Sequence, residues 1–283
     1  MALTEIKRNT AYTVDIDLGA DADTVLGLYE VYVSLVHDWG DTVVAETRAS
    51  RVSAGLYDHS FSPSEMASSG IHKVHWRWVI GGDEFTQNDY ANVTQQYIDA
   101  DSFFALHEEL EDEYYDYFDA VESVARGVID TFCGQSFQFF HDKEITFDGS
   151  GTAIQVLPMR IDDLTAATLD AVDVIDSVEI LPDSDWYVRC VKEGEISKFT
   201  TDQPLVITGD WGWPYVPTNV TRACDYLIED ILSNDRANYK YGVKRAWQDL
   251  SRFDFTEVIY FTTGNLDVDV LLMDYVYFTP DMV

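Results

Sequence analysis

The stretch that decides the fold is "LVITGDWGWPYVPTNVTRACDYLIEDIL", residues 205–232, where the apolar period changes. Its first part, "LVITG", is a short apolar run bounded by turn residues, which predicts a strand that ends in a glycine turn. Pro214 and Pro217 restrict the backbone before a helix, and Thr218 or Asn219 can cap that helix. Apolar residues at spacings of three and four then form one stripe: Val220, Ala223, Cys224, Leu227, Ile228, Ile231 and Leu232.

The aromatic residues of this turn are costly to leave in water and can cover the end of a core. We therefore interpret the turn as a rigid structural latch between a strand and a helix, and not as a ligand pocket. The latch comprises Trp211, Trp213, Pro214, Tyr215 and Pro217.

Before this stretch, residues 10–93 carry short alternating segments separated by turn residues, which predicts an antiparallel β-sandwich. In "VHWRWVI", Val74, Trp76 and Trp78 fall on one face. Turn chemistry predicts loops at "SAGLYDHSFSPSEMASSG" and "IGGDEF". A Cys…Trp…Cys pattern is absent, which argues against a true antibody-type domain.

The period then becomes helical, with apolar spacings of three and four over residues 106–132. Ser102 is a plausible N-cap, and Gly134 lies where a C′ glycine belongs. We interpret the acids from Glu108 to Asp119 as a solvated face of this helix.

Short strands return over residues 136–209, at "FQFFHDKEITF", "AIQVLP", "VEILP", "DWYVRCV" and "LVITG". Helices are expected at 217–233 and 236–250. The segment 266–283 alternates enough for a strand but also fits a helix, and we favour a short helix followed by an extended tail. The expected class is α+β: an N-terminal antiparallel β-sandwich (1–98), then a helical domain (99–283) with a β insertion (about 136–209).

The charge balance is strongly acidic, with 51 Asp and Glu against 18 Lys and Arg and a formal net charge of −33. Such self-repulsion is relieved by salt, so we interpret the chain as a protein of a high-salt organism and expect folding to weaken below about 0.5 M salt. The alternative is an acidic partner-binding protein from ordinary cytosol. A general affinity for nucleic-acid phosphate is disfavoured, because it needs clustered Lys and Arg.

The sequence offers no motif for catalysis or for a metal ion. His72 and His75 are three apart in an expected strand and so lie on opposite faces. Asp pairs such as Asp183/Asp185 are expected from composition alone. Cys133, Cys190 and Cys224 are dispersed, which favours buried residues over a disulfide or zinc framework. We predict no catalytic residue, no metal and no cofactor.

No apolar run is long enough to span a membrane. The N-terminus lacks the features of a secretory signal, so we expect the protein to remain in the cell that makes it.

The upstream segment "YDYFDAVESVARGVIDTFCGQSF" (115–137) together with "GWPYVPTNVTRACDYLIEDIL" (212–232) resembles the head–tail adaptor proteins of tailed viruses. In that family a similar helix precedes the β insertion, and Phe132, Cys133, Gly134 and Phe137 match its end. Phe132-Cys133 replaces the more usual Thr before the glycine. The segment 53–82 resembles the Ig-like accessory domains of virion proteins.

The resemblance implies a structural protein with no enzymatic activity, located in the virion neck after synthesis in the host cytoplasm. It implies a homo-oligomeric ring, commonly of twelve copies, beneath the portal protein. Such a ring extends the DNA channel without specific DNA binding, joins the next connector or tail-completion protein, and contacts no membrane. The acid content points to a virus of a halophilic archaeon.

The resemblance also implies two sets of contact residues. Subunit contacts are expected at Tyr117, Val121, Val124, Val128, Leu227 and Ile231. Portal docking is expected at Tyr275, Tyr277, Phe278 and Pro280.

Two alternatives remain open. The first alternative is another structural protein of a haloarchaeal virion, such as a tail-completion or decoration protein. The second alternative is a halophilic hydrolase or carbohydrate-binding protein, for which Asp183 and Asp185 are the candidate acids.

Overall fold

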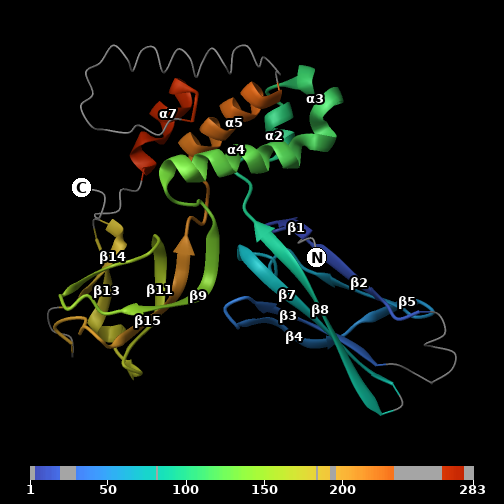
Figure 1. Cartoon of the computed structure of the whole chain (residues 1–283), viewed down its shortest axis with the longest axis horizontal. Coiled ribbons are helices and arrows are strands. Elements are labelled where there is room, and N and C mark those ends of the chain that lie inside the picture. Colours follow the sequence, from blue (N-terminus) through green and yellow to red (C-terminus); the bar gives the residue numbers. More distant parts are fainter. Residues whose placement is uncertain are drawn as a thin grey trace. The chain divides into compact units, whose positions relative to one another are not determined.

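A computed structural model describes residues 4–19, 30–80, 82–182, 184–191, 196–232 and 263–276. The chain forms two compact units, each made of two separate stretches of sequence. The β unit comprises Met1–Gln95 and Gln138–Gly212, and the helical unit comprises Gln96–Phe137 and Trp213–Val283. The α+β class expected from the sequence is confirmed (Figure 1). The division into domains at residue 98 stays a prediction.

The first part of the β unit contains two sheets whose inner side chains form one buried cluster. One sheet has the order β1-β8-β7-β3-β4, and the other has the order β2-β6-β5. The pairing of β1 with β8 is parallel, and the other pairings in these sheets are antiparallel. The bounds are β1 Thr4–Lys7, β2 Tyr12–Asp17, β3 Val31–His37, β4 Thr42–Arg48, β5 Ser50–Ser53, β6 Leu56–Phe61, β7 Gly70–Ile80 and β8 Asp83–Thr94. The immunoglobulin-like arrangement itself stays a prediction.

The alternating pattern placed the β7 side chains correctly: Val74 and Trp76 are fully buried, and Trp78 packs against the same cluster. The prediction of loops at 53–70 and 80–85 was wrong for β6 and for Asp83–Phe85 at the start of β8. The first half of β8 exposes both faces, so it lacks the apolar alternation by which a half-buried strand is recognised.

The second part of the β unit is the β insertion, which also contains two sheets around one buried cluster. Their orders are β12-β11-β15-β9 and β10-β14-β13, and all their pairings are antiparallel. The bounds are β9 Phe139–Asp148, β10 Ile154–Val156, β11 Ile161–Leu169, β12 Val172–Asp173, β13 Val178–Leu181, β14 Ser184–Cys190 and β15 Pro204–Gly212. The sequence predicted β9, β10, β13, β14 and β15 but missed β11 and β12.

Within the β unit, the two parts are joined by hydrogen bonds at the start of β9. The Ser69 N–H donates to the carbonyl of Phe139 at 2.7 Å. The His141 N–H donates to Ser68 Oγ at 3.0 Å. Nearby, the rings of Trp39 and Phe140 pack edge to face with centroids 6.2 Å apart. The loop before β7 is therefore hydrogen-bonded directly to the first strand of the β insertion.

The helical unit packs α4 and α5 around a shared apolar cluster, with α7 against α5 (Figure 1). The bounds are α2 Ala100–Phe104, α3 Glu108–Tyr114, η1 Tyr115–Tyr117, α4 Phe118–Cys133, α5 Thr218–Leu232, α7 Leu266–Leu272 and η3 Met273–Tyr275. The predictions of α5 and of a short helix near residue 266 are confirmed. The predicted helix at 236–250 lies outside the described residues.

The prediction of one continuous helix after Ser102 was wrong, because the segment is broken into α2, α3, η1 and α4. The N-cap is Asp99, whose carboxylate accepts the Ser102 N–H at 2.8 Å. Gly134 does end α4 in the left-handed region, with φ of 65°. In the described part of the chain, no helix is long and apolar enough to cross a bilayer.

Candidate functional site

The predicted latch spans the end of β15 and the start of α5. Trp211 is fully buried in the core of the β insertion, and its indole N–H donates to the Lys143 carbonyl at 2.7 Å. Trp213 belongs to the helical unit and donates its indole N–H to Gln135 Oε1 at 3.2 Å. Gly212, between them, has φ of 88°, and a Cβ there would lie 2.0 Å from the Gln138 carbonyl oxygen. This position therefore requires glycine.

The other latch residues differ in environment. Tyr215 is 84% exposed, whereas Pro214 and Pro217 are half-buried. The Pro217 carbonyl accepts the N–H groups of Val220 and Thr221 at 2.9 and 3.0 Å, so it forms part of the first turn of α5. The assignment of the whole set as a latch stays a prediction.

The residues predicted for subunit contacts fall into three environments. Tyr117 and Val124 are 65% and 58% exposed, and Ile231 also reaches solvent. Val121 and Val128 are half-buried against the helical core, and Leu227 is buried within it. In this conformation the exposed members are the ones available to a second chain.

Of the predicted docking residues, Tyr275 lies in η3 and packs edge to face on Phe137 and Trp213. Its carbonyl accepts a hydrogen bond from Gln135 Nε2 at 2.5 Å. Tyr277, Phe278 and Pro280 lie outside the described residues.

The structure adds exposed apolar residues that the sequence analysis did not select. Leu266, Val270 and Met273 are exposed along α7 and η3, while Val268 and Leu272 are buried in the core. Leu266, Val270 and Met273 are spaced by four and three residues, which places them on one helical face. The sequence therefore contained a signal by which this exposed face could have been predicted.

A buried polar network, also missed, lies on α4. The fully buried Glu122 accepts the Tyr97 N–H at 2.9 Å and pairs with Arg126 at 3.3 Å. One turn further along, Asp130 accepts a hydrogen bond from the Tyr97 hydroxyl. Burial raises the pKa of Asp130 to about 6. The Tyr97 hydroxyl also accepts the Phe137 N–H at 2.9 Å. The network therefore bonds α4 to Tyr97, which precedes the helix, and Tyr97 to Phe137, which follows it.

A second buried polar group lies at the end of β3. The His37 ring stacks on Trp39, with centroids 4.0 Å apart, and meets His72 edge to face at 4.5 Å. Burial, followed by the influence of His72 and His141, lowers the pKa of His37 to about 3. Burial also lowers the pKa of His72. Both rings therefore stay neutral near pH 7 and act as packing groups.

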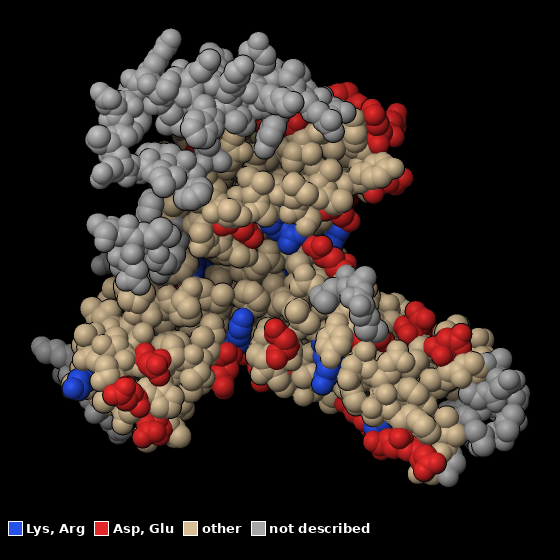
Figure 2. Space-filling model, viewed as in Figure 1, with Lys and Arg blue, Asp and Glu red and all other residues tan. Residues whose placement is uncertain are grey.

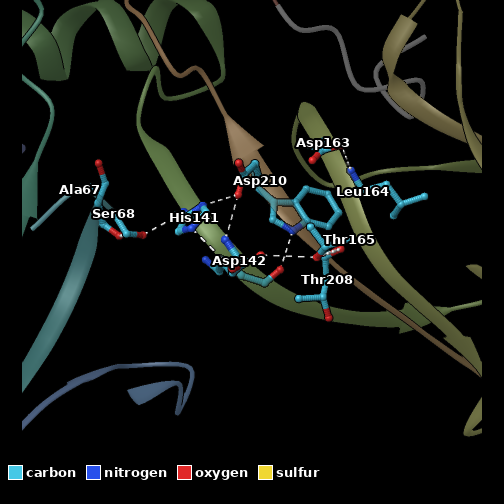
Figure 3. Close-up of polar contacts among 12 residues, drawn as sticks. Ala67, Ser68, His141, Asp142, Asp163, Leu164, Thr165, Thr208 and Asp210 are labelled. Carbon is cyan, nitrogen blue, oxygen red and sulfur yellow. Dashed lines mark hydrogen bonds and ion pairs between the residues drawn. The ribbon is translucent and has the colours of Figure 1, made fainter. Parts of the chain in front are cut away.

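An exposed polar cluster consists of His141 and Asp142 on β9 and Asp210 on β15 (Figure 3). His141 Nδ1 lies 2.7 Å from Asp210 Oδ1, and the Asp142 N–H donates to the same oxygen at 3.0 Å. His141 Nε2 lies 3.5 Å from Asp142 Oδ2. One ligand atom from each residue falls within 4.8 Å of the others.

An irregular register between β9 and β15 creates this arrangement. Gly209 pairs with Lys143 and Trp211 with Phe140, so His141 and Asp142 together oppose Asp210. Asp142 has φ of 47°, in the left-handed region. This bulge brings two consecutive side chains to one carboxylate, although neighbours in a regular strand point to opposite faces.

The candidate acids of the hydrolase alternative are not gathered into a comparable cluster in the described residues. Asp185 pairs with Arg160 at 2.8 Å, and Asp162 pairs with the same guanidinium at 3.0 Å. Asp183 lies outside the described residues. The acids Glu108 to Asp119 are exposed, as expected for a solvated face. Cys133 and Cys224 are buried, Cys190 is half-buried, and all three are free thiols.

No protein-family model matches the chain, and no curated protein matches it. Among solved structures, part of the chain is similar to the X-ray structure of the endo-beta-1,4-mannanase from Thermotoga petrophila. The TM-score is 0.26 at 14% sequence identity, over 33% of this chain and 18% of that chain. A likeness at this level carries no argument about function.

Proposed function

We propose that this chain is a structural protein of a virion, a head–tail connector adaptor that assembles as a ring beneath the portal. The ring extends the DNA channel, joins the capsid to the next connector or tail-completion protein, and performs no catalysis. The proposal begins from the sequence resemblance of residues 115–137 and 212–232 to such adaptors.

The observation that carries the proposal is the exposure of apolar side chains on the helical unit. Tyr117 and Val124 lie exposed at the start and in the middle of the α4 region, and Leu266, Val270 and Met273 lie exposed on α7 and η3. Large apolar side chains that gather on helices favour association with another protein surface. We propose that a second copy of this chain covers these exposed apolar side chains, as ring assembly requires.

The charge fits a channel component. Figure 2 shows carboxylates spread over the visible described surface, with fewer Lys and Arg side chains. A wall without clustered cations does not hold phosphate, so DNA can pass along it.

Ring assembly is tested with the purified full chain in about 2 M KCl, which screens its self-repulsion. Mass photometry and electron microscopy are expected to show a closed ring of twelve copies. The double variant Tyr117→Glu/Val124→Glu should shift the population to monomers. The matched control is Val52→Glu on β5, where the native side chain is 56% exposed. A wild-type protein that stays monomeric in high salt and in the presence of portal would overturn the proposal.

Imaging of the virion separates the adaptor from the other structural alternative. An adaptor occupies a single vertex, between the portal and the tail. Density for this chain over the whole capsid surface would instead identify a decoration protein.

A further inference from the structure

We propose that the cluster at the β9–β15 bulge is a binding site for a divalent transition-metal ion such as Zn²⁺. The ligands are His141 Nε2 and the Asp142 carboxylate, and Asp210 positions the imidazole. This site is independent of the connector proposal.

Asp210 provides the orientation that a metal-binding imidazole needs. Its Oδ1 lies 2.7 Å from His141 Nδ1, so Nδ1 carries the proton and donates to the carboxylate. In the neutral ring the lone pair is then on Nε2. Metal-bound histidines commonly donate their other ring N–H to a carboxylate in this way. The same Oδ1 accepts the Asp142 N–H at 3.0 Å, which fixes the backbone of the second ligand.

The spacing of the two ligand atoms is compatible with a shared metal ion. His141 Nε2 and Asp142 Oδ2 are 3.5 Å apart, beyond the usual 2.7–3.2 Å range of a hydrogen bond. Two ligands at about 2.0–2.1 Å from Zn²⁺, separated by a tetrahedral angle, are about 3.4 Å apart. The observed separation therefore matches the span across one bound ion.

The site is accessible to solvent, and its two carboxylates outnumber the one imidazole between them. His141 and Asp142 are both more than half exposed. Among the described residues, no Lys or Arg forms an ion pair with Asp142 or Asp210. The neighbouring Lys143 ammonium lies over the rings of Phe140 and Trp39, at 4.2 and 5.3 Å from their centroids. The carboxylates therefore remain available to attract a cation.

The donor set indicates the kind of ion. An imidazole nitrogen favours Zn²⁺, Cu²⁺ or Ni²⁺ over Mg²⁺ and Ca²⁺, which prefer oxygen ligands. Two protein ligands leave the remaining positions to water. We therefore expect binding weaker than at a structural site with four protein ligands.

The test is calorimetric titration of the full chain with Zn²⁺ in about 2 M sodium nitrate, which screens the protein's charge. We expect one stoichiometric site in the wild type. His141→Gln and Asp142→Asn should abolish that site, and Asp210→Asn should weaken it roughly 10–100-fold by removing the positioning carboxylate. Mg²⁺ should not compete at equal concentration.

Two matched controls separate this site from nonspecific binding to a very acidic protein. His75→Gln removes an imidazole from β7 that, among the described residues, is hydrogen-bonded to Asn88 at 2.7 Å. Asp112→Asn removes one exposed charge from α3. Both should bind Zn²⁺ as the wild type does.

A second readout needs no variant: Zn²⁺ should shift the NMR resonances of the His141 imidazole in the wild type before those of His75. The proposal is overturned if His141→Gln or Asp142→Asn binds as tightly as the two controls. It is also overturned if the His141 resonances do not respond to Zn²⁺.

Discussion

Trp211 and Trp213 are two residues apart, but their side chains enter different cores. Trp211 is fully buried among the strands of the β insertion, where it is the β15 partner of Ile161 on β11. Trp213 packs in the helical unit against Phe137 and Tyr275, with ring centroids 5.4 and 5.9 Å away. Gly212 between them adopts a positive φ, which turns the chain from one core to the other.

The two cores also differ in how they hold polar groups. In the described residues of the β insertion, the buried polar side chains are the uncharged Gln155 and Ser177. The helical unit instead buries the Glu122–Arg126 pair, with Asp130 one turn beyond. The β insertion therefore depends mainly on packing, whereas the helical unit also depends on electrostatics and should respond to pH.

The largest effect is expected for Trp211→Ala. The change removes a fully buried indole and its hydrogen bond to Lys143, so the free energy of unfolding should fall by about 3–5 kcal/mol. Chemical denaturation at high salt measures this loss. A loss below about 1 kcal/mol would show that Trp211 does not anchor the β insertion.

The next effect is expected for Asp130, through pH. Its folded-state pKa of about 6 lies above the ordinary value of 3.8, so the folded state holds this proton more tightly than the unfolded chain does. The stabilisation is fully present below about pH 4 and is lost as the pH rises through about 6. Asp130→Asn should abolish this decline.

The measurement is the difference in unfolding free energy between Asp130→Asn and the wild type at constant high salt. Between pH 4 and pH 8, the unfolding free energy of the variant should rise relative to that of the wild type by at most about 3 kcal/mol. The exposed Asp112→Asn should run parallel to the wild type. Parallel curves for Asp130→Asn as well would mean that this carboxyl does not titrate in this range.

A smaller loss is expected for Trp213→Ala. Its indole is only partly buried, so we expect about 1–2 kcal/mol, less than for Trp211→Ala. Ring assembly, measured by mass photometry, should weaken together with stability. A loss equal to that of Trp211→Ala would remove the contrast between the two cores.

The smallest effect is expected for Tyr215→Ala. This latch residue is 84% exposed, so the free energy of unfolding should change by less than about 0.5 kcal/mol. Thermal melting in high salt checks this. A loss similar to that of Trp213→Ala would show that Tyr215 is covered in the folded protein or in its oligomer.

Local patterns predicted some elements well. The stripe of α5 and the glycine after α4 depend on contacts within a few residues, so the sequence shows them directly. The break between α2 and α4 was not predicted, because acidic and aromatic residues there tolerate a helix throughout. Asp99 acts as N-cap where Ser102 was expected, since both residue types can cap a helix.

The metal-capable cluster could not be predicted. His141 and Asp210 are 69 residues apart and meet only because β9 pairs with β15. A bulge has no reliable signature in apolar alternation, so the sequence indicated neither the register nor the approach of Asp142. The predicted contact residues show the converse limit: periodicity placed Leu227 and Ile231 in one stripe, but packing buried the first and left the second in contact with solvent.

The sequence by itself determined the α+β class, the strongly acidic surface and the change from strand to helix at residues 205–232. These properties follow from the amino-acid composition and from the spacing of apolar residues within short segments of the sequence. Only the tertiary structure decided which cores the two tryptophans enter, which carboxylates are buried, and which imidazole meets a carboxylate. Those outcomes depend on pairing between distant segments, because burial and desolvation are properties of the packed chain and not of any single segment.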